Sequence, residues 1–445
     1  MTKMWRNLFL YIVFTMFFWT VCFNKTQAAE QIEYKTKLTK VTIQGVTYEY
    51  VPLVYDPEDE EDDGFGNYYR VAKFEQEYQG GKPIYTDIVI QGIIEGIGVE
   101  VVGPSAFANH PEIASVTFLP DTIGLSGVIY IKQFAFLGCT GLKKIEFDGS
   151  VSEIGAHAFQ GCNNLTEIEF SQITDWVGEY AFEGCSSLTS IAFVDTIWEI
   201  GECAFANCTS LTTIAFKKGA HKTIVGKDAF INTAVVNAAH KKGNATILEN
   251  GVLLEGQAVK GNVNLSNDDV KVIMPYAFAG NQNIKKITLD GVKRIGANAF
   301  TETSITNVRI NNAKSIARCA FTRCKRLRKA SISGVRHISY GMFAECKKLK
   351  KVILTGTRSI NTDVFEGCKR LRVLSIRSEE KLIWARCGTD GKKILEDCKK
   401  LKKINLKTRG VSKSIKRAGI SKNVKLNVPS KKKNAYSKYV KCKVI

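Results

Sequence analysis

Several residue types that carry chemistry are scarce in this chain. It has eight prolines beside 36 glycines, which excludes a proline-rich or collagen-like chain. The five histidines are scattered, without the spacing of a zinc protease: His110, His157, His221, His240 and His337. A hydrophobic content of 44% is ordinary for a folded protein and excludes a wholly disordered chain.

Catalytic motifs are missing as well. The sequence contains no phosphate-binding glycine loop and no Gly-x-Ser-x-Gly nucleophile elbow. Cys203 with Cys208, and Cys319 with Cys324, form Cys-x-x-x-x-Cys pairs, but neither has a second half at the spacing of a zinc site. We therefore predict that the chain is not an enzyme and holds no cofactor or metal.

The beginning of the chain has the features of a secretory signal. Lys3 and Arg6 precede an apolar stretch at residues 8–23, and small residues follow up to Ala28. We interpret residues 1–28 as a cleaved signal peptide. An uncleaved anchor is the alternative, since about 16 apolar residues fall a little short of the roughly 20 that span a bilayer. After cleavage we expect no integral membrane segment, and a protein that is secreted or associated with the cell surface.

A phenylalanine, usually preceded by alanine, recurs every 21 to 25 residues along most of the chain. After an early copy at Phe107, the copies are Phe136, Phe159, Phe182, Phe205, Phe230, Phe278, Phe300, Phe321, Phe343 and Phe365. In seven copies a cysteine follows three residues later and a leucine three further on, as in Cys162 and Leu165. Cys398 and Leu401 continue this spacing, with Leu395 in the phenylalanine position.

Each leucine opens a segment of the form Leu-x-x-Ile-x-Phe, such as LKKIEF from residue 142. Its alternating β-branched and aromatic residues predict a short strand. One parallel strand per 21–23 residues predicts a repeat solenoid, because no single repeat can bury its own apolar face. We expect Ile-Gly pairs before the phenylalanine, as in Ile154-Gly155 and Ile200-Gly201, to allow a tight bend.

The compound Ala-Phe-x-x-Cys-x-x-Leu-x-x-Ile pattern resembles the BspA-like leucine-rich-repeat family of bacterial surface proteins. The resemblance covers about residues 96–425. It implies a curved leucine-rich-repeat array that presents adhesion or interaction surfaces, and it implies no catalysis.

Three segments depart from the repeat. Residues 29–95 predict a small β-rich N-terminal cap around an acidic loop, which also resembles the opening of a calcium loop but has Arg70 in place of the closing carboxylate. Residues 231–277 form an irregular unit with a hairpin turn at Asn250-Gly251, either a packing insertion or a ligand loop. Residues 426–445 predict a short C-terminal cap.

Thirteen cysteines would ordinarily suggest disulfides in a secreted chain. Eight of them occupy the same position in different repeats, so we predict an inward ladder of buried free thiols. Cys203 and Cys319 are also expected to face inward. Cys387 and Cys442 have no role in the repeat.

The two parts of the chain carry opposite charge. Residues 295–445 hold 39 Lys and Arg against nine Asp and Glu, whereas residues 1–294 hold 24 against 34. Residues beside the central isoleucine of each strand point outward, and the basic ones predict a stripe that attracts a polyanion. They are Lys286, Arg309, Lys329, Lys351 and Lys403.

We therefore expect a secreted or cell-surface interaction and adhesion module whose exposed strand face binds a protein or a polyanionic glycan or wall polymer. The alternative function is a structural protein held on the anionic wall polymers of the producing cell. A lysine-rich surface that serves only solubility is the remaining interpretation of the stripe. Nucleic acid is disfavoured, because few aromatic residues are expected on this face.

Overall fold

A computed structural model describes residues 40–51, 68–94, 97–119, 128–147, 150–168, 175–193, 197–216, 223–248, 251–266, 268–385 and 393–445. The predicted signal peptide and acidic loop, His221 and Cys387 lie outside these residues. The chain divides into two compact units, Met1–Val41 and Thr42–Ile445, and the second holds the repeats.

The segment before the first repeat is rich in short strands, as predicted for a cap. Its strands are β1 (Lys40–Ile43), β2 (Val46–Val51), β3 (Tyr68–Phe74), β4 (Tyr78–Gln79), β5 (Lys82–Pro83) and β7 (Ile93–Ile94). β2 and β3 are antiparallel, and β3 continues in parallel to β8 (Ile97–Val102). Tyr48 and Tyr69 are fully buried, so the cap closes the end of the repeat core.

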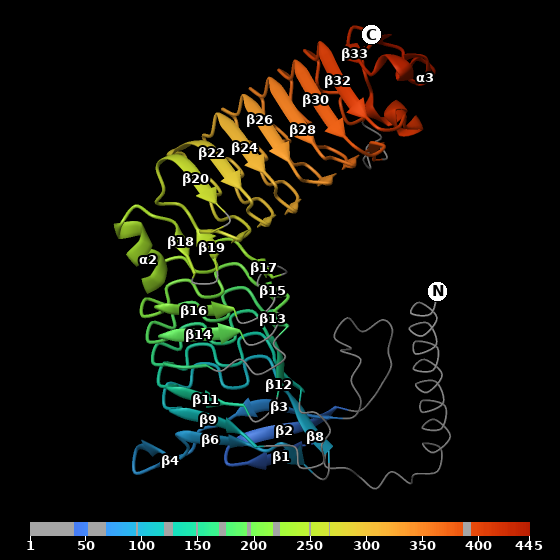
Figure 1. Ribbon diagram of the computed structural model, residues 1–445. Helices are drawn as coiled ribbons and strands as arrows, with labels where there is room; N and C mark the ends of the chain where they lie inside the picture. Colours follow the sequence, from blue (N-terminus) through green and yellow to red (C-terminus); the bar gives the residue numbers. More distant parts are fainter. Residues whose placement is uncertain are drawn as a thin grey trace, which may run out of the picture. The chain divides into compact units, whose positions relative to one another are not determined.

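The Leu-x-x-Ile-x-Phe segments form a first ladder of parallel strands (Figure 1). In the N-terminal repeats these are β6 (Asp87–Ile90), β9 (Ser115–Phe118), β11 (Lys144–Glu146), β14 (Ser190–Phe193) and β16 (Thr213–Phe216). In the C-terminal repeats they are β20 (Gly261–Ser266), β22 (Ile284–Asp290), β24 (Asn307–Asn311), β26 (Lys329–Ser333), β28 (Lys351–Thr355), β30 (Val373–Ser378), β32 (Lys403–Thr408), β33 (Lys425–Asn427) and β34 (Lys443–Val444). The solenoid prediction is therefore confirmed.

A second ladder was not predicted. Most repeats add a short strand that ends at the isoleucine of the Ile-Gly pair or at its equivalent. After β8 these are β10 (Val128–Ile131), β12 (Ser150–Ile154), β13 (Trp176–Val177), β15 (Glu199–Ile200), β17 (Ile224–Val225), β19 (Val252–Glu255), β21 (Val272–Ile273), β23 (Arg294–Ile295), β25 (Ser315–Ile316), β27 (His337–Ile338), β29 (Ser359–Ile360) and β31 (Ile383–Trp384). Most of the described repeats thus have two strands rather than the single strand expected.

The glycine after the second strand serves close packing, not the bend that we expected. A Cβ added to Gly201 would lie 2.4 Å from the backbone nitrogen of Glu179, one repeat earlier. The left-handed residue comes two positions later, at His157 (φ 58°) or Cys203 (φ 53°). Glycine is therefore required because neighbouring turns approach too closely for a side chain.

Two ladders of side chains fill the core between the strands. The repeat phenylalanines stack on one another, for example Phe159 on Phe182 with ring centroids 5.1 Å apart. The eight repeat cysteines are buried and free, as predicted. Each also donates a hydrogen bond from its thiol to the carbonyl oxygen of a phenylalanine in the preceding repeat, as Cys346 does to Phe321 at 3.1 Å. Cys203 and Cys319 are only half-buried.

The irregular unit replaces one first-ladder strand with a helix, α2 (Ala234–Lys241). It continues into β18 (Thr246–Ile247), which is antiparallel to β19, so the predicted hairpin is present. Val236 on the helix and Leu253 on β19 are buried. These contacts favour the packing insertion over the ligand loop.

The C-terminal segment contains η1 (Lys413–Ala418), η2 (Ser430–Lys432) and the short helix α3 (Lys433–Ser437). Tyr436 of α3 is buried, and its hydroxyl lies 2.9 Å from the hydroxyl of Thr408. β34 then pairs with β33, so a final strand follows the helix.

Candidate functional site

The exposed face of the C-terminal first ladder is organised in rows that cross the strands. The register of the parallel pairs aligns equivalent positions of neighbouring strands about 4.8 Å apart. The lysine row consists of the residue just before the central buried residue of each strand. Its members are Lys286, Asn307, Lys329, Lys351, Val373, Lys403, Lys425 and Lys443.

Two further rows run beside the lysine row. The middle row contains Thr288, Arg309, Ser331, Ile353, Ser375, Asn405 and Asn427. The outer row contains Asp290, Asn311, Ser333, Thr355, Arg377 and Lys407. Neighbouring rows are two residues apart along each strand, or about 6.6 Å.

All five predicted site residues are exposed on this face, but they do not form a single stripe. Lys286, Lys329, Lys351 and Lys403 belong to the lysine row, whereas Arg309 lies in the middle row, paired with Thr288 and Ser331. The lysine row continues to Lys425 and Lys443, which were not predicted from the sequence.

Lys329, Lys351 and Lys403 also belong to a larger group of cations at the beginning of the strands, and the other members of this group were not predicted. In four repeats, the repeat leucine three positions after the cysteine is preceded by two basic residues and followed by one or two more, and all of them are exposed. We call these residues the strand-start band. Its members are Lys325, Arg326, Arg328, Lys329, Lys347, Lys348, Lys350, Lys351, Lys369, Arg370, Arg372, Lys399, Lys400, Lys402 and Lys403. The signal was present in the sequence as a recurring Cys-Lys-Lys/Arg-Leu-Lys/Arg.

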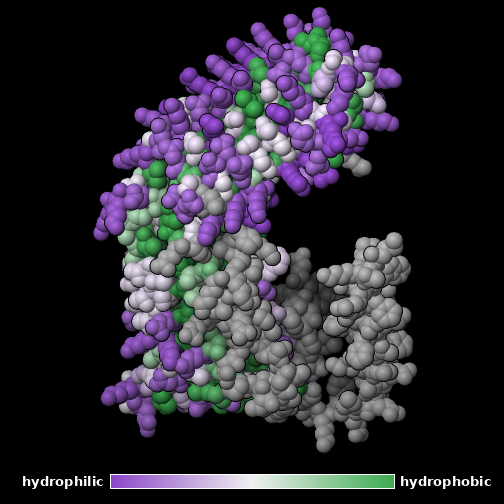
Figure 2. Space-filling view, viewed as in Figure 1, coloured by the Kyte–Doolittle hydropathy of each residue, from purple (hydrophilic) through white to green (hydrophobic). Residues whose placement is uncertain are grey.

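The equivalent positions of the N-terminal repeats are mostly neutral. They are Asn163, Asn164, Thr166 and Glu167 in one repeat, and Ser186, Ser187, Thr189 and Ser190 in the next. Figure 2 shows hydrophilic side chains dense over the C-terminal strands and a paler surface around β14 and β16. The cations are therefore concentrated at the strand starts of the C-terminal repeats, whereas the corresponding positions in these two N-terminal repeats carry little charge.

Few carboxylates neutralise the strand-start band. Lys347 lies 3.2 Å from a carboxylate oxygen of Glu345, and both side chains are exposed. Within the ranges that the structure describes, the other members of the band form no ion pair. Because like charges repel, such a band is stabilised when a polyanion binds.

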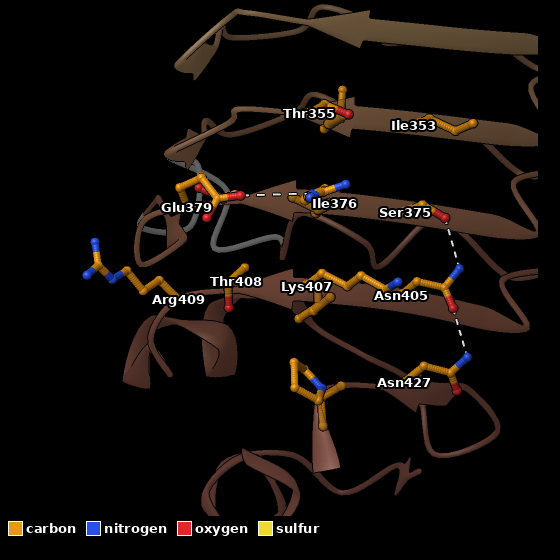
Figure 3. Close-up of a pocket in the computed structure, with 16 residues that line it drawn as sticks. Ile353, Thr355, Ser375, Ile376, Glu379, Asn405, Lys407, Thr408, Arg409 and Asn427 are labelled. Carbon is orange, nitrogen blue, oxygen red and sulfur yellow. Dashed lines mark hydrogen bonds and ion pairs between the residues drawn. The ribbon is translucent and has the colours of Figure 1, made fainter. Parts of the chain in front are cut away.

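A groove of about 920 Å³ crosses the same face at β28, β30, β32 and the end of β33 (Figure 3). Its lining includes residues of the middle and outer rows, among them Arg377 and Lys407, and also Arg409, which follows β32. Arg377 pairs loosely with Glu379, with 3.9 Å between Nε and Oε1, and both side chains are strongly exposed.

Neutral hydrogen-bonding groups form a line along the groove. Asn405 Nδ2 donates to Ser375 Oγ at 2.9 Å, and Asn427 Nδ2 donates to Asn405 Oδ1 at 2.8 Å (Figure 3). The buried Asn427 Oδ1 accepts no hydrogen bond from any residue that the structure describes. The groove thus combines amides and a hydroxyl with cations on its outer side.

The described part of the chain contains no cluster of His, Cys, Asp and Glu able to hold a metal ion. No helix among the described residues is both long enough and apolar enough to cross a membrane. Burial raises the pKa of the Cys139, Cys208 and Cys398 thiols to about 12, so these thiols do not provide nucleophiles at neutral pH.

Comparison with known proteins supports the repeat assignment. A family model described as the BspA type leucine rich repeat region matches residues 100–237 and 260–372 in six copies. No curated protein matches the chain.

Several solved structures match most of this chain at low sequence identity. A leucine rich cell surface protein from Faecalibacterium prausnitzii is 19% identical, with 83% of this chain and 94% of that chain covered and a TM-score of 0.35. A leucine-rich repeat protein from Bacteroides ovatus is 19% identical over 88% and 100% of the two chains, with a TM-score of 0.35. The pneumococcal vaccine antigen PcpA is 16% identical over 92% and 99%, with a TM-score of 0.38.

Proposed function

The chain belongs to the BspA type leucine rich repeat family, and from this premise we propose that it is a secreted or surface interaction protein that binds a polyanionic macromolecule. The family consists of repeat proteins that are generally not enzymes. The binding surface is the exposed first-ladder face of the C-terminal repeats, with Lys286, Arg309, Lys329, Lys351 and Lys403 among its contacts.

One observation carries this proposal: the strand-start band and the lysine row place many unneutralised cations in register on one face. Neighbouring strands are about 4.8 Å apart, which is less than the Debye length of about 8 Å at physiological salt. Their fields therefore add, and an extended anion gains from several cations at once.

The test is binding of the full chain to a sulfated glycan, a polyglycerol-phosphate wall polymer and an acidic protein, at low and at physiological salt. A variant with the five predicted residues changed to Glu is expected to lose binding. The control changes Lys293, Lys314, Arg336, Lys381 and Lys413 to Glu, because these exposed residues lie outside the first ladder and the net charge changes equally. If both variants lose the same amount of polyanion binding, or if neither loses any, the proposed surface is contradicted.

The alternative function, retention on the wall of the producing cell, also depends on attraction between the cationic face and an anionic polymer. If it is the function, the polyglycerol-phosphate polymer binds in preference to the sulfated glycan, and moderate salt releases it. A partner that also makes apolar contacts stays bound at that salt.

A further inference from the structure

The groove at the C-terminal end of the array has a composition that differs from the rest of the cationic face. We propose that it binds a linear acidic polysaccharide that lies across the strands, with about one sugar unit for each strand. This inference rests on the proposed polyanion binding and names the class of polyanion.

The direction of the ligand follows from the shape of the groove. Its lining comes from successive segments, residues 353–355, 375–379, 405–409 and 427–429, which belong to neighbouring strands or directly follow them. A ligand that fills the groove therefore crosses the strands and meets a new one about every 4.8 Å.

This spacing selects between extended polymers. One sugar unit of an extended glycan advances the chain by close to one strand spacing. An extended peptide presents side chains on one side every two residues, or about 6.6 Å, so it falls out of step within a few strands. The phosphates of a polyphosphate chain follow one another more closely than the strands do.

The line of Ser375, Asn405 and Asn427 requires a ligand with its own hydrogen-bond donors and acceptors. Each amide uses one Nδ2 hydrogen within the line and keeps a second one. Ser375 Oγ and Asn405 Oδ1 each accept one hydrogen bond within the line and keep a further lone pair that can accept another. Sugar hydroxyls donate and accept, whereas an ionised polyphosphate only accepts, so a glycan matches this line and a polyphosphate does not.

Cations lie on both sides of this neutral line. Lys403 and Lys425 of the lysine row are about 6.6 Å to one side, and Arg377 and Lys407 of the outer row are about 6.6 Å to the other. Carboxylate or sulfate groups that project alternately from the two edges of a glycan chain would meet both rows. The loose, exposed Arg377–Glu379 pair stabilises little, so a ligand anion can replace it.

The test uses the full chain and size-defined oligosaccharides of a polyuronate and of a sulfated glycan, beside inorganic polyphosphate and polyglutamate of matched charge. Affinity for the oligosaccharides is expected to rise with each added unit up to about four, one for each strand lining the groove, and then to level off. Polyphosphate and polyglutamate are expected to bind more weakly at physiological salt.

The decisive variant changes Ser375, Asn405 and Asn427 to Ala, which leaves the net charge unchanged. Oligosaccharide binding should weaken about tenfold while polyphosphate binding stays the same. The control changes Asn164, Ser190 and Thr213 to Ala, which are exposed residues of the N-terminal repeats outside the proposed binding surface, and should have no effect. If the triple variant does not fold, Arg377→Gln with Lys407→Gln tests the outer row instead.

The outcomes separate the two proposals. Strong polyanion binding without preference for the oligosaccharides, or without any effect of the groove variants, overturns the polysaccharide assignment and leaves the proposed function standing. Failure of every polyanion to bind overturns both.

Discussion

The thiol of Cys162 donates a hydrogen bond to the backbone carbonyl oxygen of Phe136, one repeat earlier, with 3.2 Å between sulfur and oxygen. The same oxygen also accepts the backbone N–H of Cys139. The cysteine ladder is therefore more than a column of small apolar side chains, because each thiol links two successive turns. Asn281, which stands in the cysteine position of its repeat, makes the equivalent bond to the carbonyl oxygen of Gly256 at 2.9 Å.

Removing one of these links should destabilise the array. Cys162→Ala loses a weak hydrogen bond and leaves a small cavity, so the free energy of unfolding should fall by about 1–2 kcal/mol. Urea unfolding followed by circular dichroism measures this loss. The half-buried Cys203 provides the control: Cys203→Ala should change stability by less than about 0.5 kcal/mol. Equal effects at both positions would show that the link contributes nothing.

The buried thiols should make the protein sensitive to alkali. Burial raises the pKa of Cys139 and Cys208 from 9.0 to about 12. Between these values the folded chain keeps protons that the unfolded chain has lost, so the free energy of unfolding falls as pH rises. Below pH 9.0 the contribution is fully present.

Each of these thiols should lower stability by about 1.4 kcal/mol per pH unit in that window. The measurement is urea unfolding at about pH 8 and about pH 10.5 for the parent and for a Cys139→Ala, Cys208→Ala double variant. The variant should lose less stability between the two pH values. The same loss in both proteins would mean that other groups determine the alkaline sensitivity.

Close packing between turns predicts intolerance at one type of glycine. Gly201→Ala places a Cβ against the backbone nitrogen of Glu179 and should lower the free energy of unfolding by about 1–3 kcal/mol. Thermal unfolding by calorimetry measures this loss. At Gly98 an added Cβ meets only the Glu100 side chain, at 3.6 Å, so Gly98→Ala should be tolerated. A stable Gly201→Ala protein would contradict the steric argument.

The sequence was sufficient to predict those features of the fold that recur in every repeat and depend on nearby residues. The spacing of phenylalanine, cysteine and leucine was enough to predict the solenoid, the strand segments and the buried thiols. The second ladder was missed because a two-residue strand such as Glu199–Ile200 has no periodicity to detect. Helix α2 was missed because it lies in residues 231–277, which were predicted only as an irregular unit with a hairpin turn.

The candidate surface was predicted only in part, because its geometry depends on strand register. Both neighbours of a central buried residue point outward, and only the pairing shows that Arg309 and Lys329 belong to different rows. Ser375, Asn405 and Asn427 are ordinary polar residues in the sequence. They form a line only because β30, β32 and β33 are adjacent and in register.

The lysine row has a gap at Val373, which is paired with Lys351 on one side and Lys403 on the other. Val373→Lys would fill this gap and should raise the affinity for a sulfated glycan by about two- to fivefold at low salt. The gain should vanish near 1 M salt, where the Debye length is about 3 Å. Calorimetric titration at several salt concentrations measures both effects.

The matched control for this change is Val373→Gln, which adds a polar side chain of similar length without charge. It should leave the affinity and its salt dependence as in the parent protein. Repulsion from Lys351 and Lys403 should cost the Lys variant less than about 1 kcal/mol of stability, so it should remain folded. If a folded Val373→Lys protein gains nothing at low salt, the polyanion does not lie on the lysine row, and the contacts must be sought among the members of the strand-start band that lie outside this row.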